Sequence, residues 1–382
     1  MKRWIIYFVI LILNILFINS CASGHENPIV LSGTHPVMAN QYIVFTGTLD
    51  KESIDSGETL YYYDMMTNNT SEITSIPENV GTTLDISGSI LVWENLGDIW
   101  MYNITSKMMQ KITSDVYIQE RPKISGNTIV WYERQNDNSY VKGFSIVNAE
   151  YFTLTNNISS GPSIDGEIVA WIDKEMEVEI IHLSSREIIP ITNTSHSVNN
   201  PFYHPMKTDV QIDRSNIIWL DYRNNNTSLD GTASIMQLIQ FNITTGIQTQ
   251  VTNNNMYIHS IDIYGNIIVW GASNSYLTEE FNTTIYTYNI NDNSTRELTC
   301  PSNSERYVFP SIYENKIAFV LISVDSRDPL TIRVYDISNE QYNDLLLHLD
   351  IQINYGYLYY IIFFIVIICI FIFIHYYVKR KQ

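Results

Sequence analysis

The sequence predicts an all-β fold, and three observations support this prediction. One short phrase with two apolar anchors occurs seven times along the chain. Its successive copies lie 38 to 51 residues apart, a spacing typical of stacked or circular repeat architectures. Each copy continues with short runs of β-branched and aromatic residues that are separated by turn residues, as in antiparallel hairpins. One such array would use nearly all of the 382 residues, so we expect one main domain.

The first element of each unit is a hairpin. The clearest copy is ISGNTIVW at residues 124–131, where an apolar and a large aromatic anchor lie seven positions apart around a Gly-Asn turn. The run before the aromatic anchor is apolar on both faces, which predicts a strand covered on both sides. We expect the aromatic anchors to pack between sheets and not to stack on sugars. The anchor pairs are Met38 and Phe45, Ile86 and Trp93, Ile124 and Trp131, Ile164 and Trp171, Ile212 and Trp219, Ile263 and Trp270, and Ile312 and Phe319.

Two further strands follow in each unit. The third strand is clear in LYYYD at residues 60–64 and in IYTYN at residues 285–289. The fourth ends on Ile-Thr or a related pair. Four-stranded sheets that are covered on both faces can stack around an axis, because every sheet then has two neighbours. The prediction is therefore a seven-bladed β-propeller, with six or eight blades as alternatives.

Closure of the ring has two possible sources in the sequence. Residues 28–31, followed by Gly33 and Pro36, look like the tail of a repeat placed ahead of the first full copy. We expect them to supply the outer strand of the last blade. The alternative is that residues 344–351 form this strand, with no exchange. Either arrangement leaves no long β edge open.

The repeat resembles a known family. The phrase P-x-I-x-G-x-x-I-V-W, followed by I-Y-x-Y-D and L-T, is similar to propeller repeats of the TolB type, which also occur in membrane-anchored surface proteins of methanogenic archaea. The resemblance covers residues 28–350 and implies a propeller with docking, adhesion or scaffold roles, although such repeats also accompany enzymes. The chain departs from the pattern at residues 141–148, which lack the Tyr-Asp pair, and at an insertion in residues 224–232.

The start of the chain has the form of a secretory signal. Two basic residues precede an apolar run at residues 4–18, and small residues occupy positions 20–23. We expect residues 1–23 to be a signal peptide and residues 24–350 to form the exported propeller. Residues 18–21 also resemble a loose lipoprotein box, which would place a lipid on Cys21.

The end of the chain predicts a membrane anchor. Residues 357–378 are almost all apolar, which is long enough for a spanning helix. Tyrosines flank this run, and basic residues follow it at positions 379–381. We therefore expect residues 351–378 to form a linker and transmembrane helix, and residues 379–382 a cytoplasmic tail. The propeller would then be the extracellular part of a single-pass cell-membrane protein.

Composition restricts the partners. Acidic residues outnumber basic residues 40 to 22, which gives a net charge of −18. Nucleic acid is thus not an expected partner, because phosphate contacts require clustered Lys and Arg. Of the three cysteines only Cys300 lies in the main domain, so we expect no internal disulfide. The sequence indicates no cofactor.

Known catalytic motifs are not recognisable in the sequence. It contains no G-x-S-x-G, H-E-x-x-H, phosphate-binding glycine loop or C-x-x-C. His196 and His204 share a loop without an evident third ligand, so no metal site is predicted. We lean against an enzyme. A site made of carboxylates on separate blade loops stays open as an alternative, because no motif would reveal it.

Loops that join successive blades are the expected place for recognition, because they meet around the central channel on a rigid scaffold. The alternative is that their aromatic residues only seal the seams between blades. The predicted ligand or partner patch consists of Arg121, Tyr203, His204, Tyr257, Arg306 and Tyr307. Ten Asn-x-Ser/Thr sequons are candidate glycosylation sites in an exported domain: Asn68, Asn69, Asn103, Asn157, Asn193, Asn225, Asn226, Asn242, Asn282 and Asn293.

These expectations combine into a hypothesis about function. The leading hypothesis is non-catalytic recognition or scaffolding at the cell surface, in which propeller loops bind an envelope protein, a glycan or another envelope polymer. The alternative is an extracellular carbohydrate-active hydrolase or lyase that uses acidic loop residues. A third class, capture of a solute for a transporter, would require a closed pocket.

Overall fold

A computed structural model describes residues 29–30, 32–48, 58–76, 83–193, 207–222, 236–253, 256–273, 283–299, 305–323, 330–344 and 346–347 of the chain. Every regular element in these ranges is a β-strand. The described ranges contain no helix that could span a membrane. All of them belong to the first of two units, Met1–Leu347 and His348–Gln382. The predicted signal peptide, transmembrane helix and cytoplasmic tail lie outside the described residues.

Seven four-stranded antiparallel sheets follow one another along the chain, and each is built from four consecutive strands. Blade 1 contains β2 (Ser32–Ala39), β3 (Tyr42–Thr48), β4 (Glu58–Asp64) and β5 (Asn69–Ile76). Blade 2 contains β6 (Leu84–Ser87), β7 (Ile90–Asn95), β8 (Asp98–Asn103) and β9 (Met108–Lys111). Blade 3 contains β10 (Ile118–Ser125), β11 (Thr128–Gln135), β12 (Asn138–Ser145) and β13 (Glu150–Thr155). Blade 4 contains β14 (Ser160–Asp165), β15 (Ile168–Ile172), β16 (Val178–His182) and β17 (Ile188–Pro190).

The remaining blades have the same order. Blade 5 contains β18 (Lys207–Asp213), β19 (Asn216–Asp221), β20 (Gln237–Asn242) and β21 (Ile247–Gln250). Blade 6 contains β22 (Tyr257–Tyr264), β23 (Ile267–Ser273), β24 (Thr283–Asn289) and β25 (Ser294–Glu297). Blade 7 contains β26 (Glu305–Tyr313), β27 (Lys316–Ser323), β28 (Leu330–Asp336) and β29 (Gln341–Asp344). A separate pair, β1 (Ile29–Val30) and β30 (Leu346–Leu347), lies beside blade 7.

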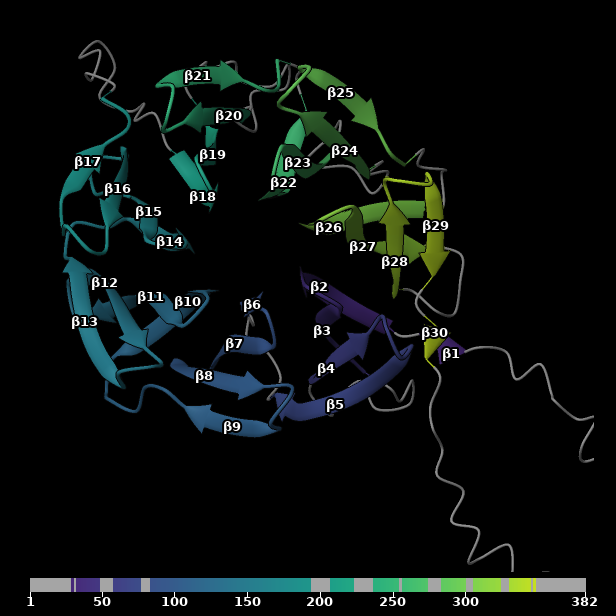
Figure 1. Ribbon diagram of the computed structural model, residues 1–382, viewed down its shortest axis with the longest axis horizontal. Helices are drawn as coiled ribbons and strands as arrows, with labels where there is room; N and C mark the ends of the chain where they lie inside the picture. Colours follow the sequence, from purple (N-terminus) through teal and green to yellow (C-terminus); the bar gives the residue numbers. More distant parts are fainter. Residues whose placement is uncertain are drawn as a thin grey trace, which may run out of the picture. The chain divides into compact units, whose positions relative to one another are not determined.

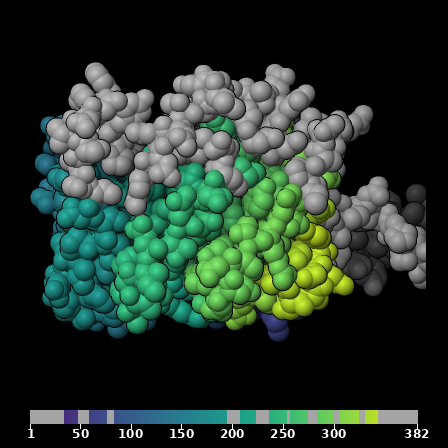
Figure 2. Space-filling model, turned by 90° about the horizontal axis from the view of Figure 1, so that it is seen from above, coloured from purple at the N-terminus to yellow at the C-terminus, as the bar shows by residue number. Residues whose placement is uncertain are grey.

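The sheets form a ring, which confirms the predicted seven-bladed β-propeller and excludes six or eight blades. The first strand of every blade faces the centre and the fourth lies at the rim (Figure 1). Seen from the side, successive blades stand next to one another, from teal through green to yellow (Figure 2). We call the edge with the turns between strands one and two the turn face. The opposite edge, where the chain passes from one blade to the next, is the loop face.

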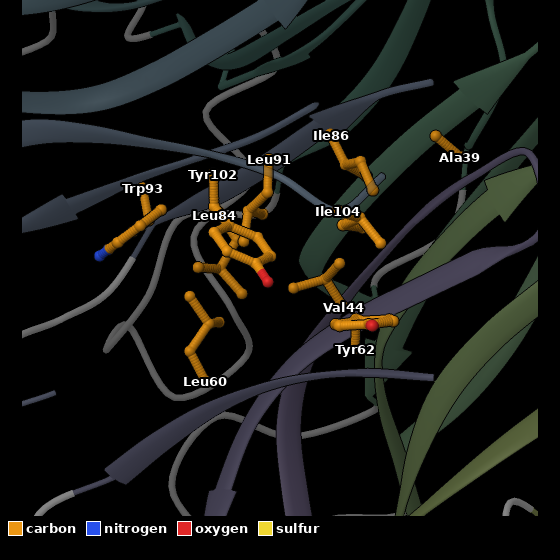
Figure 3. Packing of buried hydrophobic residues seen from close by; sticks show 10 residues of the cluster. All are labelled: Ala39, Val44, Leu60, Tyr62, Leu84, Ile86, Leu91, Trp93, Tyr102 and Ile104. Atoms are coloured by element: carbon orange, nitrogen blue, oxygen red, sulfur yellow. The ribbon is translucent and has the colours of Figure 1, made fainter. Parts of the chain in front are cut away.

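The repeated phrase forms the first hairpin of each blade, and its aromatic anchors fill the seams. All seven anchors lie in the second strand, and none is more than 2% exposed. Figure 3 shows one seam, where Val44 and Leu60 of blade 1 pack with Leu91 and Trp93 of blade 2. The second strands have apolar residues on both faces because one face packs against the preceding blade and the other face packs against the following blade. Packing against both neighbours makes each anchor part of the common core.

The Ile-Thr phrase has a structural role in four blades. Its threonine hydroxyl accepts a hydrogen bond from one of the first three backbone N–H groups of the third strand, at the loop face. The bonds run from Ile99 to Thr113, Val178 to Thr192, Leu238 to Thr252 and Ile285 to Thr299, at 2.8, 2.9, 2.9 and 2.9 Å. Since these threonines are buried, the bond satisfies a donor that water would not reach.

Ring closure differs from the prediction. The outer strand of blade 7 is β29, which pairs with β28, while the N-terminal β1 pairs with β30. The expected exchange of residues 28–31 into the last blade is therefore wrong, and the alternative strand at 344–351 begins too late. The cause is local. The turn before β29 is fixed by bonds from Ser338 N to Asp336 and from Gln341 N to Asn339, so the adjacent segment forms a hairpin with β28.

The atypical third copy forms a complete blade. Residues 141–145 lack the Tyr-Asp pair but lie in the eight-residue strand β12. Gly143 replaces a bulkier residue there because the ring of Phe152 lies against it, and a Cβ at this position would come within 2.4 Å of that ring. The insertion at residues 224–232 falls outside the described residues.

Candidate functional site: the loop-face mouth of the channel

The seven inner strands line a central channel with two cavities. The cavity at the loop face has a volume of about 490 Å³, and the cavity at the turn face has a volume of about 380 Å³. All seven blades contribute residues to both cavities. A ligand in either one would thus contact several blades at once, and the rigid ring would hold these contacts in place.

A β-bulge places side chains at the loop-face mouth. Six of the seven first hairpins shift register near the start of the inner strand. In four of them one residue of the bulge has positive φ: His35, Arg121, Asp209 and Phe309, at 50°, 55°, 52° and 54°. All four line the loop-face cavity. Non-glycine residues rarely adopt this conformation, and bulges often redirect a side chain at a functional site.

Two of the four bulge residues form a ring pair, and the other two interact through their charges. The rings of His35 and Phe309 lie 4.1 Å apart across the closure between blades 1 and 7. Arg121 is exposed and donates to Ser160 Oγ at 3.3 Å, and its chain packs over Gly161, where a Cβ would come within 2.7 Å. Asp209 is in contact with solvent. The channel walls nevertheless desolvate its carboxyl enough to raise the pKa, which the charges of Arg121 and Lys123 oppose.

A carboxyl pair lies beside Arg121 at the seam of blades 2 and 3. Burial, and secondarily the charge of Glu120, raise the pKa of Glu94 to about 7, while a backbone hydrogen bond and the charge of Arg121 oppose the shift. Glu120 is held by Arg134, whose Nη2 lies 2.8 Å from its carboxylate. The two carboxyl groups therefore have different environments, and Glu94 can gain or lose a proton near neutral pH.

The carboxylates of the turn-face half have a structural use. Side chains next to the apolar anchors accept backbone N–H groups of the following blade. Asp85 accepts from Ile124, Asp165 from Arg214, Asp213 from Gly265 and Asp262 from Ile312, at 2.7, 2.7, 2.8 and 2.9 Å. Serines do the same for Gly126, Gly166 and Ile212. These bonds connect neighbouring blades around the channel. The acidic residues therefore have a structural role, and no ligand is needed to account for them.

Burial raises the pKa of three of these carboxyls, Asp85, Asp213 and Asp262. The pKa of Asp262 rises to about 6, although the N–H of Ile312 and the charge of Lys123 oppose this. The pKa of Asp85 is also raised by burial, and Lys123, 3.7 Å away, opposes the shift most. Lys123 is thus the cation that faces the acidic half of the channel.

The predicted patch is not assembled on one surface by the residues that the structure describes. Arg121 lines the channel mouth as expected. Tyr257 and Tyr307 are buried, and Tyr307 donates to Glu305 at 2.8 Å. Arg306 is half-buried in β26. Tyr203 and His204 lie outside the described residues, so a joint role of the six stays a prediction.

The described sequons lie at turns and strand ends. Asn68, Asn69, Asn193 and Asn293 are exposed, Asn103, Asn157 and Asn242 are half-buried, and Asn225, Asn226 and Asn282 lie outside the described residues. Several of these asparagines stabilise turns: Asn68 accepts from Tyr63 Oη at 2.9 Å and Asn293 from Tyr288 Oη at 2.6 Å. Turn chemistry therefore accounts for part of the Asn content, and glycosylation stays a prediction.

Sequence reasoning missed most of the charged residues at the channel mouth. It found Arg121 but not Lys123 or Asp209, and it also missed Glu94 beside the mouth, because no motif marks them. The available signal was positional: Lys123 directly precedes an apolar anchor and Asp209 lies three residues before one, which places both on an inner strand. Within the described ranges, no group of three or more His, Cys, Asp or Glu side chains is arranged to hold a metal ion.

Comparison with solved structures identifies similar propellers. The chain resembles a puromycin-hydrolysing peptidase of Mycobacterium tuberculosis, with 8% identity over 84% of this chain and 54% of that chain and a TM-score of 0.60. It therefore spans about half the length of that peptidase. It also resembles the β-propeller domain of the Trilobed protease from Pyrococcus furiosus, which has an open velcro topology, with 9% identity over 85% and 98% of the chains and a TM-score of 0.59. The third is an oligogalacturonate lyase in complex with manganese, with 11% identity over 81% and 86% and a TM-score of 0.55.

These similarities show the fold alone, because the identities are low. A putative TolB from Agrobacterium tumefaciens also matches, with 13% identity and a TM-score of 0.44, which is too low to support an argument. No family model matches the chain, and no curated protein matches it. The similarity to membrane-anchored archaeal surface proteins thus stays a prediction from the sequence.

Proposed function

We propose that the propeller is a non-catalytic recognition module that binds an envelope protein or polymer at the loop-face mouth of its channel. The observation that supports this most is the shared bulge, which directs His35, Arg121, Asp209 and Phe309 from four blades into one cavity. An aromatic pair, a guanidinium and a carboxylate provide apolar contact and both signs of charge. Such a mixed site on a rigid scaffold suits recognition of a polar macromolecule.

The binding test compares two arginines. Arg121→Ala removes the guanidinium at the mouth, and Arg296→Ala removes an exposed guanidinium at the rim of blade 6. Full-length protein in lipid nanodiscs is immobilised and exposed to fractionated envelope proteins and polysaccharides of the source cell. The expected result is retention of one component by the native protein and by Arg296→Ala, with at least about tenfold weaker retention by Arg121→Ala. Equal retention by both variants contradicts a role for the channel mouth.

The proposed location is the cell surface. Residues 1–23 would direct export, residues 24–350 would form the extracellular propeller, residues 351–378 would anchor it as the linker and transmembrane helix, and residues 379–382 would be cytoplasmic. The support is the apolar run and the basic tail in the sequence. An epitope tag after residue 382 should be protected from external protease in intact cells, while the propeller should be accessible to antibody. An accessible tag contradicts this topology.

A carbohydrate-active hydrolase or lyase is the second candidate, and Glu94 is the observation that favours it. A carboxyl with a pKa of about 7 beside the carboxylate of Glu120 resembles the acid and base pairing that glycoside chemistry uses. One fold neighbour is an oligogalacturonate lyase. The test is release of reducing or unsaturated sugar ends from envelope polysaccharide. Activity that Glu94→Gln abolishes, with melting temperature unchanged, would support the enzyme over the recognition module.

A further inference from the structure

A separate cavity of about 470 Å³ opens at the loop face between blades 2 and 3, and its wall shares no residue with the channel cavities. Its rim contains exposed residues of the connection between the blades and of β13. Its deeper wall contains side chains of β11 and β12. The rim residues are Ser114, Asp115, Tyr151 and Thr153, and the deeper residues are Trp131, Glu133 and Lys142.

The deep wall has a fixed and electrically balanced carboxylate. The side chain of Glu133 is 1% exposed, and Lys142 Nζ lies 2.6 Å from it. Trp131 Nε1 and Gln119 Nε2 also donate to it, each at 3.4 Å. Since Glu133 is saturated with donors, it would not bind a cation. Lys142 is still 25% exposed and has ammonium protons to offer a ligand that contains acceptor oxygens.

One acceptor at the rim of this cavity is open to a ligand. Asp115 Oδ1 accepts from Tyr117 N at 2.9 Å and from Gln119 Nε2 at 2.6 Å, while its other oxygen accepts no hydrogen bond from the described residues. These two bonds hold the carboxylate in place at the exposed rim, so its second oxygen can accept a hydrogen bond from a ligand hydroxyl.

Tyr151 gives the cavity an apolar side. Its side chain is 62% exposed, but its hydroxyl donates to the carbonyl of Ile112 in blade 2, and its ring packs against Phe144 at 4.8 Å. The ring is therefore held in place while one part of it faces solvent. A fixed aromatic ring beside polar groups matches the two kinds of surface on a sugar, whose C–H groups pack on rings and whose hydroxyls both donate and accept.

We propose that this pocket binds a neutral sugar unit of an envelope glycan. Its hydroxyls donate to Asp115 and accept from Lys142, and its ring lies against Tyr151. Charge selects a neutral unit, because the pocket has two carboxylates and one ammonium, and the chain has a net charge of −18. The assignment to an envelope glycan rests on the proposed recognition function, but the pocket itself stands independently of the channel mouth.

The test is saturation-transfer NMR on the full-length protein in lipid nanodiscs, which avoids glycoside detergents. The probes are the methyl glycosides of glucose, galactose and mannose, with methyl glucuronoside as the charged comparison, each at about 10 mM, since single sugar units bind with millimolar affinity. The expected result is transfer to at least one neutral glycoside and less to the glucuronoside. Transfer to none of the neutral glycosides, or stronger transfer to the glucuronoside, overturns the proposal.

Variants locate the binding. Asp115→Asn and Tyr151→Ala should each weaken binding of the neutral glycoside by about tenfold, whereas Tyr151→Phe, which keeps the ring, should retain it. The matched control is Asp292→Asn, because Asp292 is exposed and, like Asp115, accepts a backbone N–H two residues later. Melting temperatures verify folding of each variant. Unchanged binding in folded Asp115→Asn and Tyr151→Ala overturns the site.

One more variant separates this proposal from the proposed function. Arg121→Ala should leave the glycoside signal intact, because Arg121 lines the channel and not this pocket. If Arg121→Ala retains envelope material like the native protein, the channel-mouth function fails while the pocket stands. Loss of the glycoside signal in Arg121→Ala overturns the pocket, because the sugar would then be in the channel.

Discussion

At the scale of single residues, the aromatic anchors show how one position holds two blades together. Trp131 is 1% exposed and belongs to the core between blades 2 and 3, where it packs with Val92, Ile99 and Ile124. Its indole N–H also donates to the buried Glu133. Truncation removes packing from both blades and leaves a cavity that the stiff sheets cannot close.

We therefore expect Trp131→Ala to lower the free energy of unfolding by about 3 to 5 kcal/mol. Trp131→Phe should recover part of the loss, because it restores ring volume without the N–H. Denaturant melts of the two variants measure both values. An unchanged midpoint for Trp131→Ala would contradict a core role for the anchors.

Protonation of Asp262 should affect the free energy of unfolding. Its pKa is raised to about 6 in the fold, and an unfolded aspartate titrates near its usual value of about 3.9. A raised pKa means that the folded state binds the proton more tightly. The corresponding stabilisation is complete below about pH 4 and is lost as the pH rises through about 6.

Asp262→Asn should imitate the neutral charge of the protonated form, and its amide oxygen can still accept from Ile312 N and Ser311 Oγ. Its NH2 group replaces the oxygen that accepts from Ile263 N, and loss of this bond offsets part of the gain. We expect this variant to exceed the native protein in stability by on the order of 2 kcal/mol at pH 8, with the difference vanishing near pH 4. Urea melts across this pH range measure it. The exposed Asp292→Asn is the control, and an equal gain there would contradict a local effect of Asp262.

At the scale of strands, the threonine at the end of the fourth strand connects it to the third. Thr299 is 3% exposed and accepts the N–H of Ile285 at 2.9 Å. Thr299→Val keeps the shape but leaves this buried donor without an acceptor, which should cost about 1 to 3 kcal/mol. Thr295→Val, in the exposed outer strand β25, should cost little by comparison. Equal midpoints in denaturant for the two variants would show that this bond does not contribute.

The sequence predicts strands better than it predicts how their side chains are used. The phrase ending at Trp131 identified the first hairpin of every blade, because strand periodicity and turn residues are local signals. The bulge at Arg121 was invisible, since nothing in the residue pattern distinguishes a positive φ there. The raised pKa of Glu94 depends on its burial and, secondarily, on Glu120 of the next blade. Both are known only once the blades are placed side by side.

At the scale of the whole molecule, closure depends on the seam between blades 7 and 1 and not on exchange of strands. Phe45 and Tyr61 of blade 1 pack with Ala318, Ile332 and Val334 of blade 7. At the turn face, Tyr313 Oη donates to Asn40 Oδ1 at 2.7 Å. The prediction that the N-terminal strand joins blade 7 was wrong for a related reason. The sequence does not show that β28 and β29 form a local hairpin, which already fills the outer position of that blade.

A shortened chain tests this closure. Residues 32–344 contain all seven blades and lack β1, β30 and both predicted membrane-directed segments. We expect this fragment to fold and to melt in one transition within about 5 °C of the chain of residues 24–350, because it loses only a two-residue strand pair. Ending the chain at residue 340 instead removes β29, exposes the edge of β28 and should lower the midpoint much further. If residues 32–344 fail to fold while the longer chain does, the β1 and β30 pair is essential, and the ring would be closed by its termini after all.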